Sequence, residues 1–130
     1  MNKIILITAA LLGVLSIVLG AFGAHGLKEL ISVESIQTFE TGVRYQMYHA
    51  LLLLFMGSSN SVSEKSKRWS FYFIVIGVLF FSGSIYGLAT NSLSSFDFKT
   101  VGFITPLGGL FLIISWITLL INFLKINADK

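Results

Sequence analysis

The sequence predicts an all-α fold: a polytopic membrane protein in which four transmembrane helices form one bundle and one domain, residues 1–130. Composition is the first observation, because 55% of the residues are hydrophobic and only 12% are charged, against about 25% charged in soluble domains. The second is four long apolar stretches, at about residues 4–22, 41–57, 69–89 and 101–124. A hydrocarbon layer about 30 Å thick needs roughly 20 such residues per helix. These stretches leave no room for a soluble catalytic domain.

The first predicted helix, at about residues 4–22, carries small residues suited to close helix packing. Gly13 lies near its middle, and Ser16, Gly20 and Ala24 follow at intervals of four. Small residues at this spacing let a second helix approach closely. We expect that helix to come from the same bundle or from a second copy of the chain.

The segment that follows predicts a hinge and then an amphipathic piece. Gly23 and Gly26 flank His25 and are expected to end the first helix. Residues 27–40 combine four charges with apolar residues at near-helical spacing, which is typical of a short interfacial segment between the first and second helices. Alternatively, the second helix begins near Ser35 and runs unbroken to its end, which would place Arg44 deeper.

The third and fourth predicted helices, at about residues 69–89 and 101–124, each carry a helix-modifying motif. Gly83 and Gly87 form a GxxxG pair in the third helix, which favours helix packing but also occurs by chance. The fourth helix contains Pro106 close to its start. Because proline lacks a backbone N–H, we expect it to kink or open the first turns.

The distribution of Lys and Arg predicts the orientation in the membrane. If four helices cross, the N-terminus, residues 58–68 and the tail share one side, which carries six basic residues: Lys3, Lys65, Lys67, Arg68, Lys125 and Lys130. The other side carries Lys28 and Lys99, plus Arg44 if its side chain reaches the interface. Cytoplasmic loops are enriched in Lys and Arg, so we expect both termini in the cytoplasm. The same topology explains the basic cluster, and no nucleic-acid partner is expected.

A polar constellation in the second helix is the strongest functional lead. Arg44, Tyr45, Tyr48 and His49 fall on one side of a helical wheel, with Glu40 beside them. A charge inside a membrane helix costs about 3 kcal/mol or more unless it is paired or hydrated. We therefore expect this side to face the bundle interior and the opposite, apolar side to face lipid.

Helix direction extends this constellation into a polar cluster in the outer half of the bundle. Its predicted members, a possible binding site, are His25, Glu40, Arg44, Tyr45, Tyr48, His49, Ser82, Ser84, Tyr86 and Thr105. The cytoplasmic half is expected to be plain Leu, Ile and Phe packing. The predicted helix-packing residues are Gly13, Gly20, Gly83 and Gly87.

The chemistry of this cluster leaves alternatives open. Arg44 could bind an anionic lipid headgroup or substrate, or pair with Glu40. His49 could relay protons, or sit neutral and hydrogen-bonded in the core. His25 and His49 without a nearby carboxylate make a poor metal site, so no metal is expected.

Catalytic chemistry is not expected from this sequence. The chain has no cysteine, which excludes Cys-ligated zinc and iron–sulfur sites. Neither a nucleophile–base–orienter set nor a phosphate-binding or dinucleotide motif is found. We expect no enzyme activity and no cofactor.

Four sequence blocks resemble the signature of a known family. The blocks "GAFGAHGL", "TGVRYQMYHALLLL", "FSGSIYGL" and "ITPLGGL" are similar to those of domain of unknown function 423, which includes YgdD-like bacterial inner-membrane proteins and animal transmembrane protein 256. That family commonly has proline before the last block, where this chain has Phe103, so entry into the fourth helix is less constrained. The resemblance implies a membrane location and no established activity, and it carries over no catalytic residues. We expect the location to be the bacterial inner membrane.

Two function classes follow from these observations. The first is a structural or accessory subunit, or an assembly factor, of a larger membrane complex or homo-oligomer. The second is a small transporter, or a lipid- or anion-binding protein, that uses the outer polar cluster. Membrane lipid is an expected partner in both classes.

Overall fold

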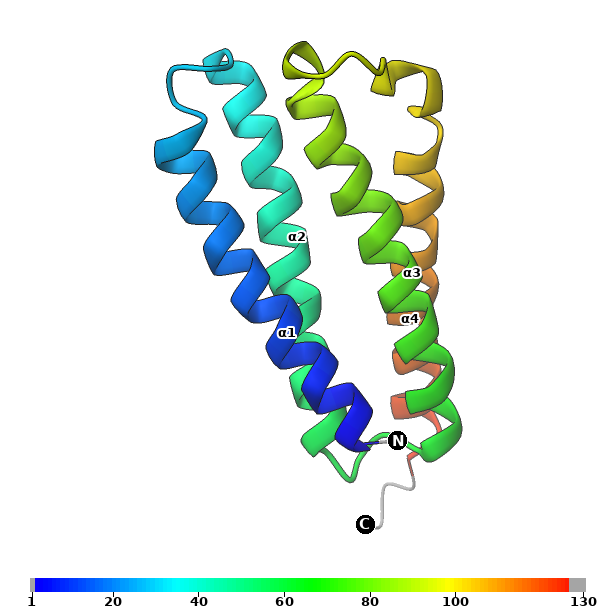
Figure 1. The fold of residues 1–130 in the computed structure, drawn as a ribbon. Helices are drawn as coiled ribbons and strands as arrows, with labels where there is room; N and C mark the ends of the chain where they lie inside the picture. Colours follow the sequence, from blue (N-terminus) through cyan, green and yellow to red (C-terminus); the bar gives the residue numbers. More distant parts are fainter. Residues whose placement is uncertain (1, 127–130) are drawn as a thin grey trace.

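Residues 2–126 are described by a computed structural model, and within them four long α-helices form an antiparallel bundle (Figure 1). The helices are α1 (Asn2–Ala21), α2 (Val33–Ser58), α3 (Glu64–Ala89) and α4 (Ile104–Leu124). One end of the bundle, here the terminal end, contains the start of α1, the α2–α3 connection and the end of α4 (Figure 1). The α1–α2 and α3–α4 connections lie at the opposite end. The all-α prediction is confirmed.

Three helical segments are long and apolar enough to cross a membrane, judged by length and composition. They are Asn2–Gly26, Glu64–Ala89 and Ile104–Leu124. Helix α2 is as long as α3, but its first half contains Glu34, Glu40 and Arg44. The second of the four predicted spans is therefore not among the segments that are apolar enough to cross a membrane by this criterion.

The separate amphipathic segment expected between the first two helices is not seen. Helix α1 continues into a π-helix, η1 (Phe22–Gly26), so Gly23 does not end it. Helix α2 begins at Val33, where the Ser32 hydroxyl accepts a hydrogen bond of 3.1 Å from the Ser35 backbone N–H. Such a cap satisfies a donor that the helix start leaves unpaired. The longer alternative for the second helix is the one found.

The other two helix starts also differ from the predicted ones. Helix α3 begins at Glu64 rather than residue 69, because the Ser63 hydroxyl caps it at the Ser66 N–H. Helix α4 begins at Ile104 rather than residue 101, after two short 3₁₀ helices, η2 (Asn91–Leu93) and η3 (Phe98–Val101). Pro106 thus lies in the first turn, where its missing N–H removes no intrahelical bond and no kink is required.

The core of the bundle is apolar and largest toward the terminal end. Its most deeply buried side chains include Ile5, Leu53, Met56, Ile74 and Leu119. A smaller apolar cluster at the opposite end contains Leu27, Phe39 and Ala89. The outward side of α1 is also apolar, with exposed Ile4, Ile7, Leu11, Val14, Ile17 and Val18. A helix that is hydrophobic all round is typical of a membrane span.

The glycines that bring helices together are mostly not the predicted ones. A Cβ on Gly108 would collide with the backbone of Phe80 and Phe81, and one on Gly77 would lie 2.6 Å from a Leu112 methyl carbon. These two glycines therefore allow the close packing of α3 and α4.

The predicted packing glycines have weaker or different contacts. A Cβ on Gly13 or Gly83 would meet open space, so neither is a close-approach point within the bundle. Gly20 faces Val43 at an ordinary 3.5 Å, and Gly87 packs on the Phe98 ring. Residue spacing identified small residues correctly but could not show which neighbour each would meet.

Candidate functional site

Helix α2 is rotated from the predicted orientation, and of the four polar residues expected to face inward only His49 does so. Arg44, Tyr45 and Tyr48 point out of the bundle, and the two tyrosines are 38% and 50% exposed. The inward side instead carries buried Phe39, Gly42, Gln46, His49 and Leu53. The small Gly42 allows contact with Ile85 and Tyr86 of α3, which fixes this rotation of α2.

The outward side of α2 near the opposite end forms a polar surface, here the α2 polar face. Its six residues line a shallow hollow of about 570 Å³ and are Glu34, Gln37, Thr38, Glu40, Thr41 and Arg44. One guanidinium nitrogen of Arg44 donates a 3.0 Å hydrogen bond to the Thr41 hydroxyl. The alternative that Arg44 pairs with Glu40 is not seen, since the ion pair found within residues 2–126 joins Lys67 and Glu64.

The α2 polar face lies beside an apolar surface of α1. Arg44 lies eleven residues beyond Val33, or about 16 Å along the helix at 1.5 Å per residue. Because Gly20 of α1 faces Val43, Arg44 is level with the part of α1 where Ile17 and Val18 are 67% and 57% exposed. A charged surface and an apolar surface therefore lie side by side at one level along the bundle.

A buried hydrogen-bond network, which the sequence did not predict, joins three helices. The Gln46 side-chain amide donates to the Leu12 carbonyl oxygen of α1 at 2.9 Å and accepts from the Tyr86 hydroxyl of α3 at 2.6 Å. The Ser82 hydroxyl donates to the Gly42 carbonyl oxygen at 2.7 Å. Gln46 is only 4% exposed. The available sequence signal was a glutamine one turn after Gly42 on the same side of the helix.

His49 is held by hydrogen bonds at both ring nitrogens. Its Nε2 accepts from the Trp116 indole N–H of α4 at 3.1 Å. Its Nδ1 lies 2.7 Å from the Tyr45 carbonyl oxygen, so the proton belongs on Nδ1 and the ring is neutral in this arrangement. No nitrogen remains for a ligand. His25 lies apart from it, exposed on η1.

The remaining predicted residues serve helix packing. Ser84 of α3 and Thr105 of α4 hydrogen-bond to each other. The predicted polar cluster is thus divided into the outward α2 polar face, the buried network that includes Ser82 and Tyr86, the His49 junction and the α3–α4 pair. In residues 2–126 no three metal-ligating side chains come together.

The terminal end is more polar than the predicted Leu, Ile and Phe packing. Lys67 is only 2% exposed; its ammonium group donates to the Asn2 side-chain oxygen at 3.0 Å and lies 3.8 Å from a Glu64 carboxylate oxygen. Ser70 and Ser115 are fully buried between α3 and α4. Lys67 thus links the start of α1 to the start of α3.

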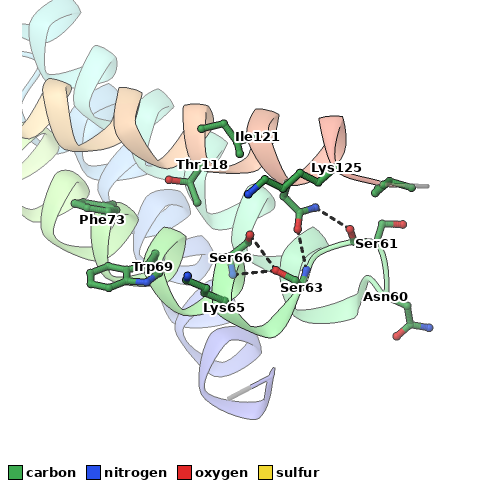
Figure 2. Close-up of a pocket in the computed structure, with 12 residues that line it drawn as sticks. Asn60, Ser61, Ser63, Lys65, Ser66, Trp69, Phe73, Thr118, Ile121 and Lys125 are labelled. Carbon is green, nitrogen blue, oxygen red and sulfur yellow. Dashed lines mark hydrogen bonds between the residues drawn. The ribbon is translucent and has the colours of Figure 1, made fainter. Parts of the chain in front are cut away.

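A groove also lies at the terminal end, between the start of α3, the end of α4 and the connection at residues 60–63 (Figure 2). Its volume is about 820 Å³, and its lining includes Lys65, Lys125 and Trp69. We call it the α3–α4 groove. The basic residues of this end were predicted only to set orientation, and nothing in their spacing indicated a groove.

The apolar outer surface and three sufficiently long apolar helices are those of an integral membrane protein of the helical-bundle class. A family model described as "Protein of unknown function (DUF423)" matches residues 19–109, which include all of α2 and α3. The chain belongs to this family, as its sequence blocks indicated.

Bacterial relatives extend the similarity over nearly the whole chain. The UPF0382 membrane protein YwdK of Bacillus subtilis is 38% identical over 128 residues, covering 95% of this chain and 98% of the relative. UPF0382 membrane protein SAB0533 of Staphylococcus aureus is 39% identical over 123 residues, covering 95% and 97%. A UPF0382 membrane protein of Haemophilus influenzae is 37% identical over 110 residues, or 85% of each chain. No solved structure matches.

Proposed function

We propose that this chain is a non-catalytic membrane subunit, structural or accessory, or an assembly factor, that binds a larger membrane protein through the α2 polar face. In this proposal all four helices cross the bacterial cell membrane, with both termini in the cytoplasm. The excess of Lys and Arg at the terminal end supports that orientation.

The observation that carries the proposal is the outward position of Arg44 at a depth where α1 exposes Ile17 and Val18. A charged side chain in hydrocarbon costs about 3 kcal/mol on insertion scales. The bond to Thr41, one turn nearer the helix start, moves the guanidinium toward the interface and lowers this cost. A protein partner that supplies a carboxylate or carbonyl oxygens would lower it further.

A different protein fits this face better than a second copy of the chain. A two-fold dimer about the membrane normal would bring the Arg44 residues of two copies to the same depth, where their like charges repel. The face also carries Glu34 and Glu40, which need donors that a heterologous partner can place independently. We therefore commit to a partner with mixed polar groups at the depth of Arg44.

The bundle interior gives less support to the transporter alternative. Gln46, Tyr86 and Ser82 direct their polar groups to neighbouring helices of the same chain. Within the part of the chain that the structure describes, every buried side-chain nitrogen and oxygen has a partner. The polar groups inside one bundle are thus already used in holding its helices together.

The proposal is tested by purifying the chain from its native membranes in mild detergent and identifying co-purified proteins by mass spectrometry. We expect one membrane protein in fixed stoichiometry with the wild type and its loss with Arg44→Gln. Lys99→Gln is the matched control, because it removes one charge from exposed η3 at the same end of the bundle. That variant should keep the partner.

A photocrosslinking amino acid in place of Gln37 should form an adduct with the same partner, while one in place of outward Leu11 on α1 should not. The proposal fails if Arg44→Gln keeps the partner, if the wild type purifies with lipid alone, or if the adduct is a second copy of the chain.

A further inference from the structure

We propose that the α3–α4 groove binds an anionic phospholipid, with the headgroup phosphate between Lys65 and Lys125 and an acyl chain along Phe73 and Ile121. The site lies at the terminal end of the bundle, away from the α2 polar face. It is therefore independent of the proposed function, and either can fail without the other.

The two lysines reach the groove from opposite walls. Lys65 lies in the first turn of α3 and Lys125 directly follows α4, and both line the same space (Figure 2). The acidic neighbour Glu64 is in contact with buried Lys67 instead. Two exposed cations that share a groove provide an electrostatic site for a phosphate, and basic pockets between membrane helices bind anionic headgroups.

A neutral donor, the Ser66 hydroxyl, lies in the groove with the two lysines. The Ser66 hydroxyl oxygen accepts a 3.0 Å bond from the Ser63 hydroxyl, so its own hydrogen can be donated to a ligand. The groove also adjoins the start of α3, where the helix dipole favours an anion. The dipole supports the site that the lysines and Ser66 define.

The opposite part of the groove is apolar, which distinguishes a lipid from a free phosphate. Trp69 is about half exposed, and its ring stacks with Phe73 at 6.2 Å between centroids. Ile121 of α4 is partly exposed across from them, and Thr118 lies beside it (Figure 2). Tryptophan is enriched at membrane–water interfaces. The lining thus changes from cationic at the helix ends to apolar toward the middle of α3 and α4, as an amphipathic ligand requires.

The buried side chain of Asn122 holds one wall of the groove in place before any ligand binds. Its side-chain oxygen accepts from the Ser63 backbone N–H at 3.0 Å, and its side-chain nitrogen donates to the Ser61 carbonyl oxygen at 2.8 Å. These bonds attach the α2–α3 connection to α4. A preformed groove avoids the entropy cost of ordering a loop on binding.

The first test uses the unaltered chain in nanodiscs of 20% phosphatidylglycerol and 80% phosphatidylcholine, released into native mass spectrometry. We expect preferential retention of one phosphatidylglycerol. Retention of the two lipids simply in proportion to their abundance in the nanodisc would overturn the proposal. Added glycerol phosphate or inorganic phosphate should not displace the lipid; displacement by either at millimolar concentration would show a simple anion site without lipid selectivity.

The second test uses Trp69 as a contact reporter. The chain has two tryptophans, so Trp116→Phe leaves Trp69 alone. Phosphatidylglycerol brominated on its acyl chains should quench Trp69 fluorescence more strongly than brominated phosphatidylcholine. Lys65→Gln with Lys125→Gln should weaken apparent phosphatidylglycerol affinity by about fivefold for each lysine removed.

The matched control is Lys3→Gln with Arg68→Gln, which removes two exposed charges from the same end of the bundle but outside the groove. This pair should keep most of the preference for phosphatidylglycerol. An equal loss in both double variants would show general attraction to an anionic surface and would contradict a specific site. Circular dichroism and the unfolding midpoint establish that Trp116→Phe and the two double variants are folded.

Discussion

Replacement of Gln46 by leucine should destabilise the bundle, because Gln46 joins α1, α2 and α3 through two side-chain hydrogen bonds. Hydrogen bonds between membrane helices contribute on average about 0.6 kcal/mol each and up to about 1.7. The Tyr86 hydroxyl would also lose its acceptor, whereas the Leu12 carbonyl keeps a bond from the Ser16 hydroxyl. We therefore expect a loss of roughly 1–2 kcal/mol in the free energy of unfolding.

The assay is reversible unfolding in mixed micelles, followed by circular dichroism as denaturing detergent is added. Gln37→Leu is the matched control, since it makes the same chemical change on the exposed side of α2 and should leave stability nearly unchanged. A double-mutant cycle with Tyr86→Phe isolates the pair and should give a coupling of about 0.6–1.7 kcal/mol. Equal effects of the two glutamine variants, or a coupling near zero, would refute the network.

Two further predictions concern the terminal end and the α3–α4 seam. Gly108→Ala should destabilise the bundle by about 1–3 kcal/mol through overpacking, because its Cβ would meet the Phe81 backbone. Gly83→Ala, whose Cβ would meet open space, should be neutral or stabilising by up to about 1 kcal/mol through helix propensity. The free energies of unfolding of the two variants test this difference, and equal losses would contradict it. Asn122→Ala should speed amide hydrogen exchange at Ser63 and proteolysis of the α2–α3 connection, because it removes both bonds that hold that connection; unchanged exchange would show that the connection is held by other contacts.

The number of long helices could be predicted, and so could three segments long and apolar enough to cross a membrane, because long apolar stretches have few alternatives to a membrane helix. Helix starts were less predictable. Ser32 and Ser63 each cap a helix whose first turn is polar. A prediction based on the apolar stretch alone therefore places the helix start too late in the sequence. A hydroxyl cap with an acidic residue in the first turn favours the earlier start of α2 that the sequence left as an alternative, and the same signal at Ser63 and Glu64 would have corrected the start of α3.

The orientation of α2 could not be predicted from its helical wheel. The wheel correctly grouped Arg44 and Tyr48 on one side of the helix. The general rule that charges in membrane helices face the bundle interior then predicted, wrongly, that this side faces inward. In the structure the inward side is selected by fit: Gly42 allows Tyr86 to approach, and Gln46 reaches partners on both neighbouring helices. Such contacts depend on residues 34 or more positions away, which no periodicity reports.

The measurement that most directly tests this account is a cysteine-accessibility scan of α2, which the chain permits without background because it contains no cysteine. Single cysteines at positions 37, 44 and 48 and at positions 39, 46 and 53 would each carry a nitroxide label in the purified chain. We expect mobile, collision-accessible labels at the first three positions and immobilised, protected labels at the last three, where the native side chains are buried. The reverse pattern would place Arg44 inside the bundle and contradict the α2 polar face.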